Sequence, residues 1–186
     1  MEKNREIKLQ NIKKILKEYT SDYEISLNDK NIFDFQVYME FLLEWNEKIN
    51  LTAIKDPENI VIKHFLDSLL LQKAVKIETK AKMIDIGTGA GFPGVPTKIV
   101  RPDIDLTLLD SLNKRLIFLE QLGKKLQIDF TLIHSRAEEG GRQKNLREQF
   151  DIVTARAVAP LNLLCEYCLP FVKVGGIFAA MKGPEI

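Results

Sequence analysis

The sequence has little of what several protein classes require. Among its 186 residues are two cysteines and one tryptophan, with 10 glycines and 7 prolines. Two cysteines cannot form a disulfide framework, and so little Gly and Pro argues against a disordered or collagen-like chain. A net charge of +1, from 27 basic and 26 acidic residues, excludes a strongly basic, histone-like binder but leaves a local basic surface open.

Long apolar runs are also scarce. The first ten residues are charged and contain no apolar core of a secretory signal. The most apolar helical stretch, residues 60–71, is interrupted by Lys63, His64 and Asp67 and is too short to cross a bilayer. His64 and His134 stand far apart, without a Cys or acidic cluster at ligand spacing. We therefore expect a cytoplasmic protein with no membrane contact and no metal site.

The hydrophobic periodicity changes near residue 80. Before it, residues 5–19 and 31–49 carry apolar side chains at helical spacing, and Asp56-Pro57 is a start signal for a third helix. After it, short apolar runs alternate with helical stretches, which is typical of βαβ units and a parallel sheet covered on both faces. We predict an all-helical N-terminal cap over 1–80 and a doubly wound, mostly parallel, Rossmann-like α/β domain over 81–186.

Five strands are predicted in the second part of the chain. They cover residues 82–87, 105–110, 129–134, 150–156 and 175–183, and helices are predicted at 112–126 and from Pro160. The last helix contains Cys165-x-x-Cys168, which imitates a redox motif. Because apolar residues surround this pair, we interpret both thiols as buried and inert.

The sharpest feature is the glycine-rich run DIGTGAGFPG, residues 85–94, where the first predicted strand ends. Glycines permit a tight turn and the close approach of a ligand, and ligands of open α/β sheets sit outside the carboxyl ends of the strands. Gly89-x-Gly91-x-x-Gly94, followed by Asp110, satisfies a dinucleotide fingerprint. A nicotinamide dinucleotide is therefore one candidate ligand.

Three features favour S-adenosylmethionine instead, a ligand with an adenosine, a sulfonium and no phosphate. Pro93 and Pro96 remove backbone donors that a pyrophosphate would use. Asp85, before the first glycine, would repel a phosphate and suits a cationic group. A helical segment as long as 1–80 is also unusual ahead of a nicotinamide domain. A dinucleotide and other uses of the turn stay open as alternatives.

Polar residues follow the later strands. Asp110 ends the second strand, where a carboxylate could accept hydrogen bonds from both ribose hydroxyls; the alternative is a solvated strand-end acid. Residues 135–138, Ser-Arg-Ala-Glu, form a predicted loop where an adenine would lie. Arg156 ends the fourth strand and would point into the cleft, unless it pairs structurally with Asp85 or Glu138.

At these residues the sequence resembles the glucose-inhibited division protein B family of small-subunit ribosomal RNA methyltransferases. The matching segments are DIGTGAGFPG, LLDSLNKR, HSRAEE and DIVTARAVAPL, in this order, with WNEKINLT and HFLDSL in the N-terminal part. The resemblance covers roughly residues 30–183. It implies a class I S-adenosylmethionine-dependent methyltransferase fold and methylation of ring nitrogen 7 of a guanine in 16S ribosomal RNA, free or in a ribosomal particle.

The resemblance also implies roles for single residues. It implies cofactor contacts for Gly87 and Phe92 in the turn, Asp110 and Ser111 at the ribose, Ala137 and Glu138 at the adenine, and Arg156 at the cofactor or the RNA. The glycine-rich turn itself adds Asp85, Gly89 and Gly91 to the expected cofactor-binding residues. Asn46, Asn50, His64 and Asp67 match the N-terminal motifs and are interpreted as tying the cap to the sheet. Nitrogen 7 has a free in-plane lone pair, so no general base is expected, and Arg156 is the one catalytic candidate.

RNA binding must come from local charge. Residues 111–147 carry eight basic and four acidic residues, and residues 1–18 carry six and three. We expect Lys114, Arg115, Lys124 and Lys125 to contact phosphates; the alternative is a solvated helix face. We expect a monomer. Two other functions stay open: a small-molecule methyltransferase with a closed apolar pocket, and a non-catalytic nucleotide-binding module.

The resemblance includes one departure. The family's α/β domain continues with further strands, whereas this sequence ends at Ile186. Either the sequence is a fragment or the remaining C-terminal strands are missing, and the fifth strand is then expected to be an unprotected edge.

Overall fold

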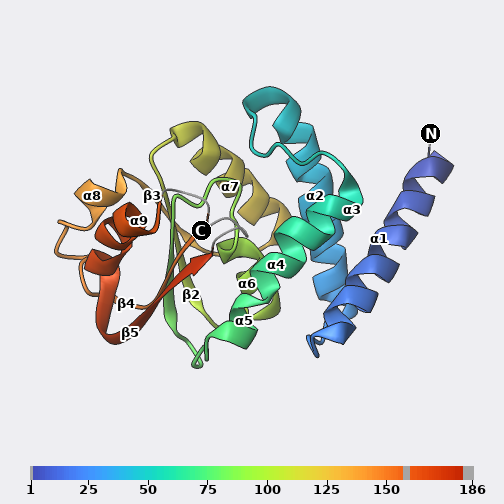
Figure 1. Ribbon diagram of the computed structural model, residues 1–186. Helices are drawn as coiled ribbons and strands as arrows, with labels where there is room; N and C mark the ends of the chain where they lie inside the picture. The colour runs from blue at the N-terminus through green and yellow to red at the C-terminus, as the bar shows by residue number, and fades with distance from the viewer. Residues whose placement is uncertain (1, 157–159, 182–186) are drawn as a thin grey trace.

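The computed structural model describes the backbone of residues 2–11 and the whole of residues 12–156 and 160–181. The helical elements are α1 (Glu2–Asp22), α2 (Asp29–Ile49), α3 (Pro57–Ile60), η1 (Val61–Leu66), α4 (Asp67–Leu69), α5 (Leu71–Ala74), α6 (Gly94–Val100), α7 (Asn113–Leu126), α8 (Ala137–Gly140), α9 (Leu161–Cys168) and η2 (Leu169–Phe171). The strands are β1 (Lys82–Ile86), β2 (Asp105–Asp110), β3 (Thr131–His134), β4 (Phe150–Arg156) and β5 (Val172–Met181). The helices of the cap lie to one side of the sheet (Figure 1).

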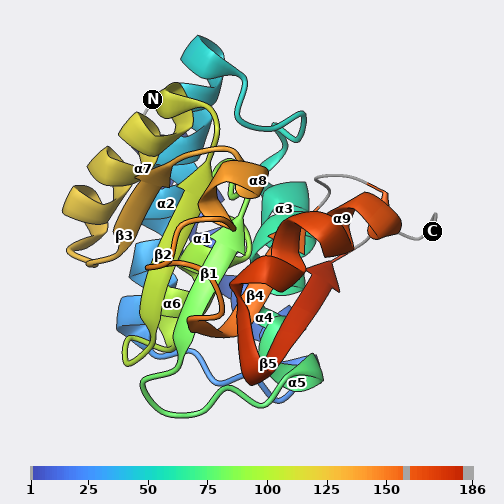
Figure 2. The ribbon, with the colours of Figure 1, turned by 90° about the vertical axis from the view of Figure 1, so that its left-hand side faces the viewer.

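The strands form one parallel sheet in the order β3-β2-β1-β4-β5, which confirms the predicted fold class. Figure 2 shows the five strands side by side, with α8 and α9 on the near side and α2 and α6 beyond. In the described part of the chain, β5 is an edge of this sheet, as predicted. The end of the predicted last strand, residues 182 and 183, lies outside the described residues.

Alternating side chains of each strand enter two cores. Met83 and Leu108 point toward α6 and α7, whereas Ile84 and Leu109 join the core beneath α8 and α9. Both faces of the central strands are therefore apolar, which explains why these strands read as near-continuous hydrophobic runs.

The cap shares the first of these cores with the sheet. Phe35, Tyr38 and Phe65 are fully buried and belong to the same cluster as Phe92 and Val95. Aromatic side chains bury large areas, so they dominate the energy of such contacts. Because the core is continuous, the division of the chain at residue 80 stays a prediction about sequence organisation.

The third predicted helix is interrupted. It begins as predicted, with the Asp56 side chain accepting a hydrogen bond from the Asn59 N–H and Pro57 in the first turn. The next six residues, Val61–Leu66, adopt a wider π-helical turn, a feature that occurs often at functional sites. None of the helices in the described residues is both long and apolar enough to cross a membrane.

Other element boundaries differ from the predicted ones. β5 begins at Val172 rather than at residue 175, and a short helix, α8, begins at Ala137, inside the loop predicted at 135–138. Both differences concern segments whose partners lie far away in the sequence. Gly140 of α8 packs against Leu109 of β2, a contact that local periodicity does not encode.

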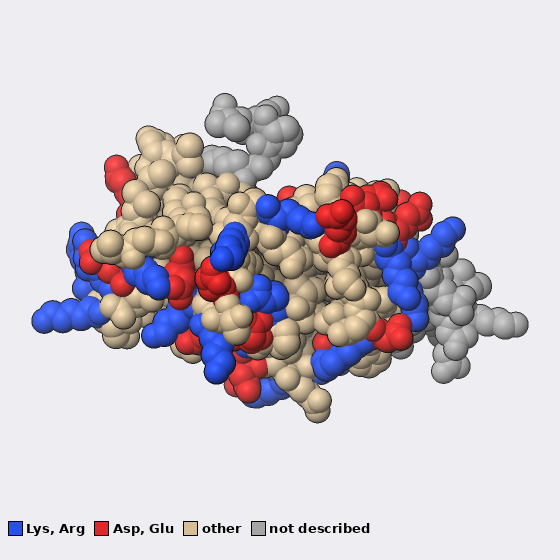
Figure 3. Space-filling model, turned by 90° about the horizontal axis from the view of Figure 1, so that it is seen from below, with Lys and Arg blue, Asp and Glu red and all other residues tan. Residues whose placement is uncertain are grey.

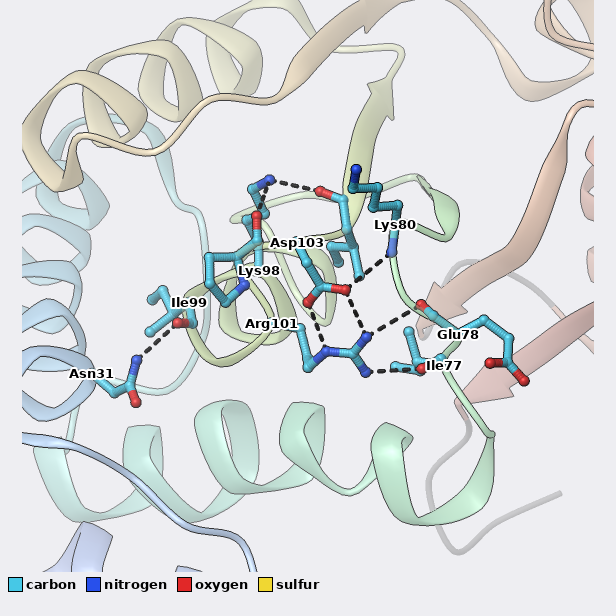
Figure 4. A network of polar contacts seen from close by, with 10 residues as sticks. Asn31, Ile77, Glu78, Lys80, Lys98, Ile99, Arg101 and Asp103 are labelled. Atoms are coloured by element: carbon cyan, nitrogen blue, oxygen red, sulfur yellow. Dashed lines mark hydrogen bonds and ion pairs between the residues drawn. The ribbon is translucent and has the colours of Figure 1, made fainter.

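A polar network fixes the opposite end of the sheet, where the strands begin (Figure 4). Arg101 binds Asp103 through two nitrogens, each at 2.8 Å, and donates to the carbonyls of Ile77 and Glu78. The Arg101 guanidinium, through its hydrogen bonds, holds the pKa of the Asp103 carboxyl well below its usual range. The network ties the segment that leaves the cap to the turn that leads into β2.

Gly91 tests how tightly cap and sheet pack. Its φ is +100°, and an added Cβ would lie 2.8 Å from the Tyr38 hydroxyl and from Val95. We predict that Gly91→Ala lowers the free energy of unfolding by about 2–5 kcal/mol, through left-handed backbone strain and overpacking. Gly175 is the matched control, because its φ is +80° and nothing lies within 4 Å of its added Cβ. Urea unfolding should show a cost of only about 1–2 kcal/mol for Gly175→Ala; equal costs would contradict the packing.

Candidate active site

A cavity of about 920 Å³ opens at the carboxyl ends of the strands. Its sheet side consists of the glycine turn after β1 and the ends of β2, β4 and β5. The residues that line its cap side are Tyr23, Leu51, Thr52, Ile62, Lys63, His64, Leu66, Asp67 and Leu70. Sites for small molecules span roughly 300–1,000 Å³. The cavity therefore has room for a nucleoside-sized ligand and lies where ligands of open α/β sheets bind.

Asp85 supports the glycine turn from beneath. Its carboxylate is fully buried and accepts hydrogen bonds from the hydroxyls of Thr88, at 2.7 Å, and Thr154, at 2.9 Å, and from the Gly94 N–H, at 3.3 Å. Burial raises the pKa of Asp85 to about 6, against the opposing effect of these donors. The side chain does not line the cavity, so a direct contact with the cofactor does not fit this geometry.

Asp110 lies at the cavity wall. It accepts hydrogen bonds from the backbone N–H groups of Gly89 and Leu112, both at 2.9 Å, and pairs with Arg115 at 3.2 Å. The residue is 1% exposed, so the alternative of a solvated strand-end acid is wrong. A carboxylate offers about four acceptor positions. Three are taken, which leaves room for one ligand hydroxyl rather than two.

Phe92 is almost completely enclosed, since it is 5% exposed. The Tyr38 ring stacks on it with centroids 5.3 Å apart, and the His64 ring stacks at 4.6 Å. The Arg156 guanidinium carbon lies 4.9 Å from its centroid. Phe92 therefore presents no free face on which an adenine could stack, and it serves as the platform on which cap and sheet meet.

Arg156 joins the end of β4 to the cap. Its Nη1 donates to Asp67 Oδ2 at 2.9 Å and to the Lys63 carbonyl at 3.1 Å, and its Nη2 lies 3.2 Å from His64 Nδ1. The predicted structural partners, Asp85 and Glu138, are wrong. The interpretation that His64 and Asp67 tie the cap to the sheet is confirmed.

The loop after α2 carries a second polar chain. The buried Asn46 side chain accepts a hydrogen bond from the Thr52 N–H at 2.8 Å and donates to the Thr52 carbonyl at 2.9 Å. Asn50 ends α2 in a left-handed conformation. His64 Nε2 then lies 2.8 Å from Thr52 Oγ1. The two asparagines thus shape the loop that brings Thr52 to the cavity.

The structure brings together six of the ten predicted cofactor residues. Those that line the cavity are Gly87, Gly89, Phe92, Asp110, Ser111 and Arg156. Gly91 instead packs against the cap, and Ala137 and Glu138 lie in α8, outside the cavity lining. An adenine contact of Ala137 and Glu138 stays a prediction, and residues 157–159 of the adjacent motif lie outside the described residues.

Sequence reasoning missed two contributions to the site. Thr52 stood inside a recognised motif, at residues 45–52, but received no role of its own. Lys63 lines the cavity and contributes a backbone carbonyl to Arg156, which no side-chain pattern reveals. Of the two thiols predicted to be buried, Cys168 is fully buried, and burial raises the pKa of its thiol to about 12. The prediction of burial is wrong for Cys165, which is only half-buried.

The comparisons with known proteins identify the family. A family model described as "rRNA small subunit methyltransferase G" (GidB) matches residues 31–185. The chain belongs to this family. Curated relatives of that name include those of Alkaliphilus oremlandii (strain OhILAs), 53% identical over 94% of this chain and 74% of its own length, and Thermoanaerobacter sp. (strain X514), 54% identical over 92% and 72%. The chain thus spans about three quarters of the length of these family members.

Solved structures of low sequence identity share the fold. A SAM-dependent methyltransferase from Aquifex aeolicus has a TM-score of 0.53 at 17% identity and is matched over 70% of both chains. Precorrin-6y C5,15-methyltransferase from Geobacter metallireducens has a TM-score of 0.51 at 20% identity, over 62% of this chain and 60% of its own. These similarities confirm the class I methyltransferase fold of this family member.

His64 gives a direct test of the contact between cap and sheet. Burial, and then the positive charge of Arg156, lower its pKa from 6.5 to about 4. We predict this value in a proton NMR titration, and an increase in the variant Arg156→Met. The sequence contains two histidines, so a His134→Asn variant assigns the signals. A His64 pKa at or above 6.5 would show that cap and Arg156 do not enclose the ring.

Proposed function

We propose that this chain transfers a methyl group from S-adenosylmethionine to ring nitrogen 7 of a guanine in small-subunit ribosomal RNA. The observation that carries the proposal is the single cavity that the glycine turn, Asp110 and the cap line together, in a chain whose relatives are named for methylation of this RNA. A cytoplasmic, monomeric and metal-free enzyme is part of the same proposal.

The residues at the cavity fit the cofactor. Gly89 has an open position, because an added Cβ would meet only the Gly87 carbonyl, at 3.9 Å, so a ligand can approach the turn closely. Asp110 keeps one acceptor position for a ribose hydroxyl, and Ser111 stands beside it. When bound, S-adenosylmethionine supplies an activated methyl group on a sulfonium. We propose that Gly87, Gly89, Asp110 and Ser111 hold it.

This reaction requires the protein to align the reacting atoms, and it requires no proton transfer. Guanine nitrogen 7 attacks with a lone pair that carries no proton, so the residues must hold nucleophile, methyl carbon and sulfur in line, with reacting atoms about 3–3.5 Å apart. His64 suits such a site because its lowered pKa keeps the ring neutral. Arg156 is already bound to the cap through Asp67 and acts by holding the cavity's shape.

Charge at the cavity favours RNA over a small apolar substrate. Three basic residues, Lys63, Arg115 and Arg156, and two acidic ones, Asp67 and Asp110, line it. Arg156 pairs with Asp67 and Arg115 with Asp110, so Lys63 leaves the cavity a net positive charge, and cations are the groups that engage a phosphate backbone. At the opposite end of the molecule, the described residues present acidic and basic side chains interspersed over the surface (Figure 3). We therefore propose that RNA approaches from the cavity side.

The four residues expected to contact phosphates do not lie together. Lys114 and Arg115 begin α7 beside the cavity, whereas Lys124 and Lys125 end it, about 15 Å further along the helix axis. Lys124 pairs with Glu120, and Lys125 lies over the Phe41 ring, 5.2 Å from its centroid. Arg115 pairs with Asp110. We propose Lys114 as the first phosphate contact; the side chains of residues 1–11, in the other basic segment, are outside the described part of the chain.

The proposed reaction can be tested by methyl transfer. Incubation with tritiated S-adenosylmethionine and small-subunit particles, with naked RNA and small molecules alongside, should label RNA. The label should sit on a 7-methylguanosine, which reduction and aniline treatment convert to a strand break that maps the position. Label on small molecules alone, or cofactor binding without transfer to any substrate, would support one of the two alternatives.

The proposed RNA surface predicts that two lysines of α7 differ in their effect on RNA binding. Lys114→Ala should weaken RNA binding and reduce the slope of its salt dependence by about one unit, the loss of one phosphate contact. Lys124→Ala, at the far end of α7, should change the slope little. Filter binding at several salt concentrations measures both variants, and equal slopes would reassign Lys114 to the solvated helix face.

The proposed cofactor contact predicts that two aspartates of β2 differ in their effect on cofactor affinity. Asp110→Asn should weaken S-adenosylhomocysteine binding about 10- to 100-fold, the scale of a hydrogen bond to a charged group. Asp105→Asn is the matched control, at the exposed start of the same strand, and should bind like the wild type. Calorimetry measures both variants, with NAD as the competing ligand, for which we expect no binding. Unchanged affinity in Asp110→Asn would exclude the ribose contact.

A further inference from the structure

The hydroxyl of Thr52 is surrounded in an unusual way. Thr52 lines the cavity, and two neighbouring groups reach its hydroxyl oxygen: the Ile54 N–H, at 3.1 Å, and His64 Nε2, at 2.8 Å. The Asn46 amide holds the Thr52 backbone at both its N–H and its carbonyl. The position of the hydroxyl is therefore fixed, and the state of the His64 ring decides which way its proton points.

Arg156 selects the tautomer of His64. A guanidinium nitrogen can only donate, and Arg156 Nη2 faces His64 Nδ1 at 3.2 Å. A proton on Nδ1 would set two donors against each other. The Lys63 carbonyl, 3.1 Å from Nδ1, has a second lone pair that could accept an Nδ1 proton, but that proton would still face the Arg156 donor. The ring, neutral because its pKa is lowered to about 4, therefore carries its proton on Nε2 and donates it to Thr52.

This arrangement leaves the Thr52 hydroxyl able to do one thing more, which is to donate its proton in a hydrogen bond. A hydroxyl has one proton and two lone pairs, and the Ile54 N–H and His64 Nε2–H occupy both lone pairs. The hydroxyl proton is then left for a hydrogen bond to a ligand in the cavity, which Thr52 lines. Asp67, Arg156, His64 and Thr52 thus form a chain that ends in a neutral hydrogen-bond donor.

We propose that Thr52 donates this hydrogen bond to O6 of the target guanine and so distinguishes guanine from adenine; the proposal rests on the proposed function. Guanine presents N7 and O6 side by side as acceptors, whereas adenine presents an amino donor in place of O6. A neutral donor suits the reaction because methylation of N7 leaves the purine positively charged, and a cationic donor would oppose that charge.

The first test reads the tautomer of His64. Long-range proton–nitrogen NMR correlation distinguishes a ring protonated on Nε2 from one protonated on Nδ1. The proposal expects the Nε2 form in the wild type at pH 7. The Nδ1 form would overturn it, because Thr52 would then have to give its proton to His64.

The second test removes the two partners one at a time. Thr52→Val keeps the shape but loses the hydroxyl, and RNA with 2-aminopurine at the mapped position loses O6 but keeps N7. We expect each change alone to lower kcat/KM for N7 methylation about tenfold, and the two together to lower it no further. Thr52→Ser, which keeps a hydroxyl, should recover most of the loss, and S-adenosylhomocysteine affinity should be the same in all three proteins.

The outcomes separate the two proposals. If Thr52→Val lowers methylation by the same factor on both RNAs, Thr52 acts only through the loop, and its contact with O6 is wrong while the proposed function stands. If the wild type places no methyl group on N7 of the unmodified RNA, the proposed function fails, and the role of Thr52 fails with it.

Discussion

The contact between the Arg156 guanidinium and the Asp67 carboxylate holds the two parts of the molecule together at the site. Arg156 comes from the end of a central strand, and Asp67 from the cap. The Arg156 side chain is only 15% exposed, so its charge needs this partner, because an unpaired buried charge is strongly destabilising. The same guanidinium lies over Phe92 and against His64, so one ion pair positions the glycine turn, the aromatic stack and the loop of Thr52.

The cavity is therefore a joint product of both parts of the chain. The sheet supplies the glycine turn and Asp110. The cap adds Thr52, His64 and Lys63, which line the same cavity. This division fits the proposed methyl transfer, in which the sheet side would hold the cofactor and the cap side would receive the base. Binding energy spent on alignment accelerates the reaction without a proton-transfer group.

The sequence predicted the parts of this structure that local patterns determine. Strand alternation gave the parallel sheet, and the glycine run gave the place of the cavity. The sequence could not predict which polar side chains bind one another, because most of those partners are distant in the chain. Arg156 pairs with Asp67 rather than with Asp85. Asp85 instead accepts hydrogen bonds from Thr88 and Thr154. The π-helical turn and the role of the Lys63 carbonyl depend on backbone geometry, which residue spacing does not express.

The energy of the contact between Arg156 and Asp67 decides whether this ion pair holds the cap to the sheet at the site. A double-mutant cycle with Arg156→Met, Asp67→Asn and the double variant measures it from free energies of unfolding in urea. The exposed pair Lys124 and Glu120 is the control, with an expected coupling below about 0.5 kcal/mol. We predict a coupling of about 1 kcal/mol or more between Arg156 and Asp67. Additive effects, within about 0.3 kcal/mol, would contradict the claim that this contact holds cap and sheet together.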